Sequence, residues 1–246
     1  MPASSILSMS TSRPSARELN TTSPFLTGMA KLATLSTESQ ELIRNLDPLD
    51  DYRASQTIRL PRGVARGAVI GSGWAARYRL LSDGRRQIVA LLLPGDMLQF
   101  GSDDSAEAQL PLTMLTRVRV LNAKPVRAAV DEGRPEHQGL TRALEKASAQ
   151  SESRLVDHIV RLGAQNGIER MAHLFVELRE RIGAIGLCDR EEFHMPLTQE
   201  CLADVLGLSI VHVNRTLQQL RREELIHLSH GRLNILKPAL LQSISE

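Results

Sequence analysis

Residues 197–220 constrain the fold more than any other part of this chain, because they have the pattern of two short helices separated by a single tight turn. Thr198 is suited to cap the first helix, since its hydroxyl can accept a hydrogen bond from a free amide of the first turn. Gly207 can take the positive φ that ends a helix without a Cβ clash. Ser209 then offers a cap for the second helix. The pattern predicts a helix-turn-helix.

The second of these helices has two different faces. Val213, Leu217 and Leu220 are spaced four and three residues apart and should be buried. The opposite face is polar and basic, and residues 209–222 contain three arginines and no carboxylate. Such a helix is suited to a DNA major groove. The alternative is an ordinary pair of packed helices without a ligand.

Residues 225–236 read as a strand, a tight turn and a second strand. A hairpin in this position would form a wing, where His227, His230 and Arg232 could contact phosphate. We expect a connecting loop at residues 183–195 and a short closing helix from Pro238 to Ser245. The candidate DNA-contacting residues are Thr198, Ser209, Val211, His212, Asn214, Arg215, Gln218, Arg222 and Arg232.

The composition limits the class of protein. The chain of 246 residues has room for two modest domains. Aromatic residues make up only 3%, which argues against stacking platforms for single-stranded nucleic acid. Two cysteines cannot build a disulfide framework, and this fits a reducing cytoplasm. No apolar run approaches membrane-spanning length, and residues 1–24 are predicted to be a disordered arm rather than a signal peptide.

Residues 25–134 are predicted to form a β-roll. A capping-box pattern at residues 37–40 predicts one short helix, which Pro48 stops. Short alternating segments separated by glycine and proline follow, and Asp83-Gly84 marks a hairpin between residues 74–81 and 86–93. Many short strands with such turns indicate an antiparallel barrel or roll.

Residues 135–163 are predicted to form one long helix. Its apolar positions follow three-and-four spacing, and they are Leu140, Leu144, Ala147, Ser151, Leu155, Ile159 and Leu162. The helix could pack on its own domain. We favour a two-helix dimer contact, because a DNA reader profits from two-fold symmetry. A further helix at residues 166–182 opens the last domain, residues 164–246.

This α+β arrangement of a β-roll, a long helix and a winged helix-turn-helix resembles the Crp/Fnr family of bacterial transcription regulators. The sequence Val-His-Val-Asn-Arg at residues 211–215 is most similar to the proteobacterial members. The resemblance implies a cyclic-nucleotide-binding-like domain and a homodimer. It also implies binding to inverted-repeat operators and contact with RNA polymerase.

Two residues match family positions in the recognition helix. Arg215 matches the arginine that reads guanine, and a guanidinium fits the O6 and N7 atoms of that base. Ser209 matches the position where a hydroxyl and an amide meet phosphate. Val211 replaces the usual glutamate, and Ile210 stands where the cyclic-AMP receptor protein has an arginine. Valine can contact a thymine methyl group, so we expect a half-site different from the usual one.

The sensor side departs from the family's cyclic-nucleotide binders. Residues 87–116 contain no lysine or arginine but include Asp96, Asp103, Asp104 and Glu107. We therefore expect no cyclic-AMP binding in the family manner. No cysteine precedes Cys188, so ligands for an iron–sulfur cluster are missing. The seven histidines show no metal spacing. No cofactor is predicted, although the ligand count leaves haem sensing open.

Cys201 suggests a redox hypothesis, because a helix N-terminus would lower its pKa and oxidation there could weaken DNA binding. The alternative is a half-buried structural cysteine. A second functional hypothesis is a small-molecule or redox receptor whose winged helix serves in partner docking. An enzyme finds no support, because the sequence shows no nucleophile–base order and no phosphate loop.

Overall fold

The computed structural model describes residues 23–60, 64–100 and 109–245. The predicted arm at residues 1–24 lies outside this part except for its last two residues, and Pro24 is already the first residue of helix α1 (Pro24–Leu32). Helix α2 (Thr37–Arg44) starts one residue earlier than predicted, because Ser36 and not Thr37 is the N-cap and accepts the amide hydrogen of Ser39.

Two antiparallel sheets form the β-roll. One contains β1, β7 and β3 in that order, and the other contains β2, β6, β4 and β5. Asp83 and Gly84 lie in the turn between β4 and β5, as predicted. Helix α3, which was not predicted as a separate element, follows the last strand. The bounds are β1 (Pro48–Tyr52), β2 (Thr57–Ile58), β3 (Ala68–Ser72), β4 (Ala75–Leu80), β5 (Arg86–Leu92), β6 (Leu112–Met114), β7 (Val118–Asn122) and α3 (Lys124–Asp131).

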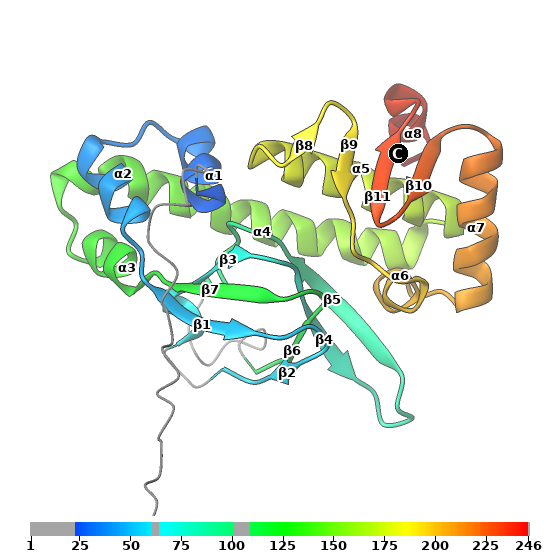
Figure 1. The fold of residues 1–246 in the computed structure, drawn as a ribbon, viewed down its shortest axis with the longest axis horizontal. Coiled ribbons are helices and arrows are strands. Elements are labelled where there is room, and N and C mark those ends of the chain that lie inside the picture. The colour runs from blue at the N-terminus through cyan, green and yellow to red at the C-terminus, as the bar shows by residue number, and fades with distance from the viewer. Residues whose placement is uncertain (1–22, 61–63, 101–108, 246) are drawn as a thin grey trace, which may run out of the picture.

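Helix α4 (Gln138–Ala164) runs along the roll and on to the C-terminal domain (Figure 1). The first part of its apolar stripe is buried within the chain, where Leu140, Leu144 and Ala147 pack with α1 and the end of the roll. In the second part, Leu155 and Ile159 are exposed. Intrachain packing therefore accounts for the apolar stripe only in the first half of α4, and the dimer contact stays a prediction.

The C-terminal domain begins with α5 (Gly167–Ala184), whose N-terminus carries a capping box between Asn166 and Glu169. The segment predicted as a loop contains two strands, β8 (Cys188–Asp189) and β9 (Glu192–His194). They extend the wing into a four-stranded sheet of order β10-β11-β9-β8. The loop prediction was wrong because pairing with β11, far along the chain, stabilises β9. The other elements are α6 (Gln199–Leu206), α7 (Ile210–Arg222), β10 (Ile226–Ser229), β11 (Arg232–Ile235) and α8 (Pro238–Ser245).

The predicted α+β architecture is confirmed: a β-roll, a long helix and a winged helix-turn-helix follow one another. The cores of the two ends are continuous. Trp74, Ile88 and Leu91 of the roll belong to the same apolar cluster as Met171 and Leu206 of the C-terminal domain. None of the helices in the described ranges combines the length and the hydropathy of a membrane-spanning segment.

Candidate nucleic-acid interface

Three caps fix how α6 and α7 meet. The hydroxyl of Thr198 accepts a hydrogen bond from the amide of Cys201 at 3.1 Å. Gly207 has a φ of +62°, the left-handed conformation that ends α6. The hydroxyl of Ser209 accepts from the amide of His212 at 3.2 Å and starts α7. Ser209 and Thr198 therefore serve the helix ends, and both remain exposed.

Helix α7 presents one polar face to solvent. Val213, Leu217 and Leu220 are buried, as predicted. On the other side, Val211 is 80% exposed and Ile210 is 46% exposed. Asn214, Arg215, Gln218 and Arg222 are also exposed, and none of these four side chains has a hydrogen bond or ion pair within the described part of the chain. This face is therefore free to contact a ligand.

His212 lies differently from the other candidate residues of α7. It is half-buried, and a Cβ added to Gly167 would lie only 2.5 Å from its Nε2 atom. The imidazole is therefore packed against the first turn of α5, where only glycine leaves room for it. This packing makes His212 a residue that positions α7 against α5 rather than one of its free side chains.

In the wing, one predicted phosphate contact, Arg232, already has an ion-pair partner within the chain. His230 (φ +48°) and Gly231 (φ +71°) form its turn. Arg232 forms an ion pair with Glu192 of β9, so its charge is already compensated. Sequence reasoning missed Glu192 because it lay in the segment predicted as a loop. The apolar Phe193 and Met195, alternating with polar neighbours, are the signal that could have identified a strand there.

The predicted lowering of the Cys201 pKa was wrong. The side chain is buried at the contact between α6 and the roll, and burial raises the pKa of this thiol to about 12, although Arg86 partly opposes the shift. The partial positive charge at a helix N-terminus, about half an elementary charge, does not compensate for that loss of solvation. The thiol stays protonated, and this argues for the structural alternative.

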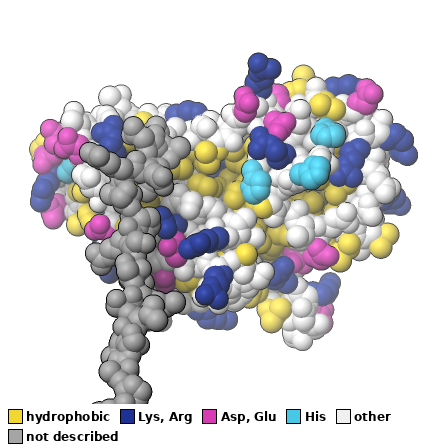
Figure 2. Space-filling model, in the orientation of Figure 1, with side chains coloured by type: hydrophobic (Ala, Val, Ile, Leu, Met, Phe, Trp, Pro, Cys, Tyr) yellow, Lys and Arg dark blue, Asp and Glu magenta, His cyan; other side chains and the backbone are white. Residues whose placement is uncertain are grey.

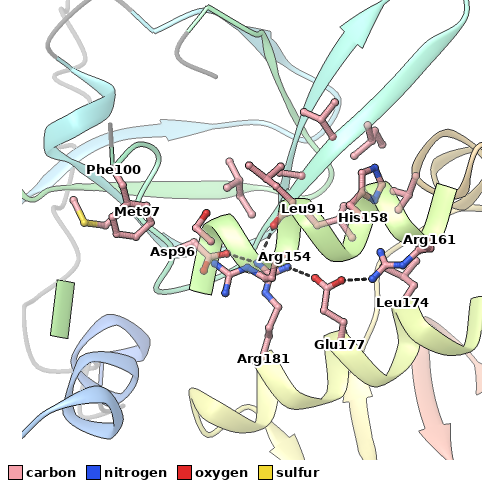
Figure 3. A pocket seen from close by; sticks show the side chains of 17 residues that line it. Leu91, Asp96, Met97, Phe100, Arg154, His158, Arg161, Leu174, Glu177 and Arg181 are labelled. Atoms are coloured by element: carbon pink, nitrogen blue, oxygen red, sulfur yellow. Dashed lines mark hydrogen bonds and ion pairs between the residues drawn. The ribbon is translucent and has the colours of Figure 1, made fainter. Parts of the chain in front are cut away.

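The roll also contacts the reading domain through charged groups that the sequence did not bring together. Arg181 of α5 lies 2.6 Å from the Asp96 carboxylate and 3.0 Å from Glu177, and Glu177 is 2.6 Å from Arg161 of α4. Burial alone would raise the pKa of Glu177, but Arg181 and Arg161 outweigh it and lower that pKa. The four groups form a chain of ion pairs linking the roll, α4 and α5 (Figure 3).

A buried arginine of the roll was missed as well. Arg77 of β4 lies outside residues 87–116, the segment without lysine or arginine. It is almost fully buried and donates a hydrogen bond to the backbone carbonyl of Leu98. Burial lowers its pKa to about 10. As for metals, no group of three or more histidine, cysteine, aspartate or glutamate side chains in the described ranges is placed to hold an ion.

Comparison with known proteins supports a common ancestry for this architecture. Residues 169–244 match the model of the Crp-like helix-turn-helix domain. The nitrogen fixation regulation protein FixK of Bradyrhizobium diazoefficiens is 34% identical over 170 residues, which cover 68% of this chain and 69% of that protein. The FixK protein of Rhizobium meliloti is 33% identical over 180 residues, 71% of this chain and 76% of that protein.

Solved structures agree. The structure of FixK2 from Bradyrhizobium japonicum superposes with a TM-score of 0.65 at 25% identity, covering 82% of this chain and 98% of that one. A CooA mutant from Carboxydothermus hydrogenoformans shares the fold with a TM-score of 0.60 at 15% identity, over 84% of this chain and 90% of that chain. The chain belongs to the Crp/Fnr family, and it is a DNA-binding transcription regulator rather than an enzyme.

Proposed function

We propose that this regulator binds an inverted-repeat operator as a homodimer and reads each half-site with α7. The observation that carries the proposal is the free face of α7, on which Arg215 and Arg222 have no partner in the described part of the chain. A cationic face without a compensating carboxylate is suited to a duplex backbone and to guanine. The Val-His-Val-Asn-Arg sequence at residues 211–215 of α7 supports assignment to the proteobacterial subgroup.

The half-site follows from the side chains on that face. Arg215 would read guanine through O6 and N7, and Asn214 has the donor and acceptor that suit adenine. Val211 and Ile210, both exposed, would contact thymine methyl groups. Ser209 and Thr198, at the two helix N-termini, would meet phosphate together with Gln218 and Arg222.

The other candidate residues have lesser roles in this proposal. His212 would position α7 through its packing on Gly167. Arg232 would reach phosphate only by giving up its ion pair with Glu192, so His227 and His230, both exposed, are the better phosphate contacts of the wing. Figure 2 shows several histidine side chains on the visible face of the C-terminal domain.

The dimer would form through the second half of α4. Leu155, Val156, Ile159 and Val160 are all exposed there, and Ile159 is 69% exposed. Four large apolar side chains on two successive turns of a helix are suited to a matching helix from a second copy. Such a pair would present two α7 helices with two-fold symmetry, as an inverted repeat requires.

We also propose that the regulator works without cyclic AMP, in the cytoplasm, and that it contacts RNA polymerase as its family does. Arg77, the buried arginine of the roll, is already hydrogen-bonded to the Leu98 carbonyl, so it is not a vacant partner for a cyclic phosphate. Calorimetry of the full chain with cyclic AMP tests this part. Binding at micromolar concentrations would contradict it.

A gel shift with operators selected from random duplexes tests the DNA contact. We expect Arg215→Ala to weaken binding by about 1–3 kcal/mol at the guanine it reads, and to relax selectivity at that base pair. Arg142→Ala is the matched control, because Arg142 is an exposed arginine of α4 away from α7. Equal affinities of Arg215→Ala and the unchanged protein would show that α7 does not read the groove. Absence of any salt-dependent binding would favour a winged helix that docks a protein partner.

A further inference from the structure

The ion-pair chain between the roll, α4 and α5 borders a cavity of about 50 Å³. Its walls come from β5, the turn around Asp96, one face of α4 and the facing side of α5 (Figure 3). This volume is the space open to the centre of a water-sized sphere, and one buried water needs on the order of 10–15 Å³ of it. The cavity therefore has room for a group of about three to five heavy atoms.

Arg154 of α4 lines this cavity and is the unusual group in it. It is only partly exposed, and it forms no hydrogen bond or ion pair within the described part of the chain. Loss of solvent lowers the pKa of Arg154, and the nearby Arg181 lowers it further, more than Asp96 and Glu177 raise it. A desolvated guanidinium that forms no ion pair is costly, so its position calls for a negatively charged partner.

Two other polar atoms in the cavity wall also lack partners. Arg161 is 1% exposed, and its Nε atom is buried without a hydrogen-bond acceptor even though the other end of the guanidinium binds Glu177. The Nε2 atom of His158, one turn away on α4, is likewise buried and unpaired. Arg154, His158 and Arg161 lie on one face of α4 at helical spacing, and all three line the cavity.

The charged side chains that line the cavity carry more positive than negative charge. Three guanidinium groups, from Arg154, Arg161 and Arg181, face two carboxylates, from Asp96 and Glu177. With His158 neutral, one positive charge remains in excess. Asp96 and Glu177 both form ion pairs with Arg181, and Glu177 also with Arg161. Both carboxylates lie near enough to raise the pKa of Arg154, but neither forms an ion pair with it.

We propose that this cavity is a binding site for a small monoanion, a short carboxylate or a planar oxyanion, held chiefly by Arg154. A guanidinium presents two parallel N–H groups that fit the two oxygens of such an anion. The cations of this site come from α4 and α5, whereas the roll contributes Asp96 and apolar side chains of β5. An occupied site would therefore bridge the long helix and the first helix of the reading domain.

Thermal unfolding of the full chain tests the site without reference to DNA. Sodium formate, acetate and nitrate are each titrated against sodium chloride at constant ionic strength. We expect at least one of the three to raise the melting temperature in a saturable way beyond chloride, as a ligand that binds only the folded state must. Equal melting temperatures in all four salts would overturn the proposal.

Variants locate the effect. Arg154→Gln should lose the saturable rise, while Arg142→Gln, the exposed arginine control on the same helix, should keep it. Arg154→Lys keeps the charge but loses the paired donors, and it should bind about tenfold more weakly. Arg154→Gln should melt no lower than the unchanged chain in chloride, because it removes a desolvated unpaired charge. An anion response that persists in Arg154→Gln would overturn the assignment. Light scattering checks that the variants have the same oligomeric state.

Discussion

Arg86 of β5 and Asp204 of α6 form a direct ion pair between the roll and the helix-turn-helix, with Arg86 Nη2 2.6 Å from Asp204 Oδ2. Next to it, the side-chain amide nitrogen of Gln87 donates to the backbone carbonyls of Asp204, at 2.8 Å, and Val205, at 3.3 Å. These carbonyls belong to the last turn of α6, where a helix leaves its acceptors unsatisfied. The roll thus caps the C-terminal end of α6, the first helix of the helix-turn-helix.

Removing this contact should uncouple the two ends of the molecule. Trp74, the single tryptophan, lies in the roll and reports its unfolding by fluorescence, whereas circular dichroism is dominated by the helices. In the double variant Arg86→Ala/Gln87→Ala, we expect the two thermal transitions to separate, because about 1–2 kcal/mol of domain coupling is lost. Arg85→Ala, which removes only the exposed pair with Asp83, should leave the two signals coincident. Coincident signals in the double variant would contradict the coupling.

Val211→Glu should change the operator that the protein prefers. A glutamate at this exposed position can accept a hydrogen bond from the N4 amino group of cytosine, which valine cannot do. We expect selection from random duplexes to shift one position of each half-site toward cytosine, with discrimination of about 1–3 kcal/mol. Leu80→Glu adds the same charge at the exposed end of β4 and should select the unchanged operator. An identical operator for Val211→Glu would show that residue 211 does not face a base.

Ile159→Glu should break the proposed dimer. Ile159 is exposed in the single chain, so the introduced carboxylate does not disturb intrachain packing. In the dimer, however, the carboxylates of the two chains would face and repel each other across the symmetric α4 contact. Light scattering should give the mass of one chain for this variant and of two chains for the unchanged protein. Leu240→Glu, an equally apolar exposed position on α8, is the control and should remain dimeric. A dimeric Ile159→Glu would place the contact elsewhere.

Cys201 gives a prediction for alkaline pH. Its folded-state pKa, raised by burial to about 12, lies above the ordinary value of 9.0. The stabilisation is therefore complete below pH 9 and is lost as pH rises toward 12, because the unfolded chain releases the thiol proton first. Between pH 8 and 10.5, Cys201→Ser should lose less stability than the unchanged protein, by about 1–2 kcal/mol. Urea unfolding at both pH values measures the difference, and equal losses would refute the burial argument.

The same burial predicts which thiol reacts. Cys188 is partly exposed, whereas Cys201 is buried. Iodoacetamide should therefore modify Cys188 first in the folded protein.

The sequence by itself determined the parts of this fold that depend on local interactions. The caps Thr198 and Ser209, the turn at Gly207 and the buried face of α7 follow from residues within one or two helical turns of each other, so the pattern specifies them. The Asp83-Gly84 hairpin is local in the same sense. The exposed face of α7 follows as well, because helical spacing fixes which side chains oppose Val213 and Leu217.

The tertiary structure alone decided the contacts between residues far apart in sequence. Pairing of β9 with β11 turned a predicted loop into part of the wing sheet and brought Glu192 to Arg232. Packing of α6 on the roll buried Cys201 and reversed the direction of its expected pKa shift. Arg154, Arg181 and Asp96 meet only because α4, α5 and the roll converge. Burial and charge pairing depend on what the rest of the chain places nearby, and no local pattern contains that information.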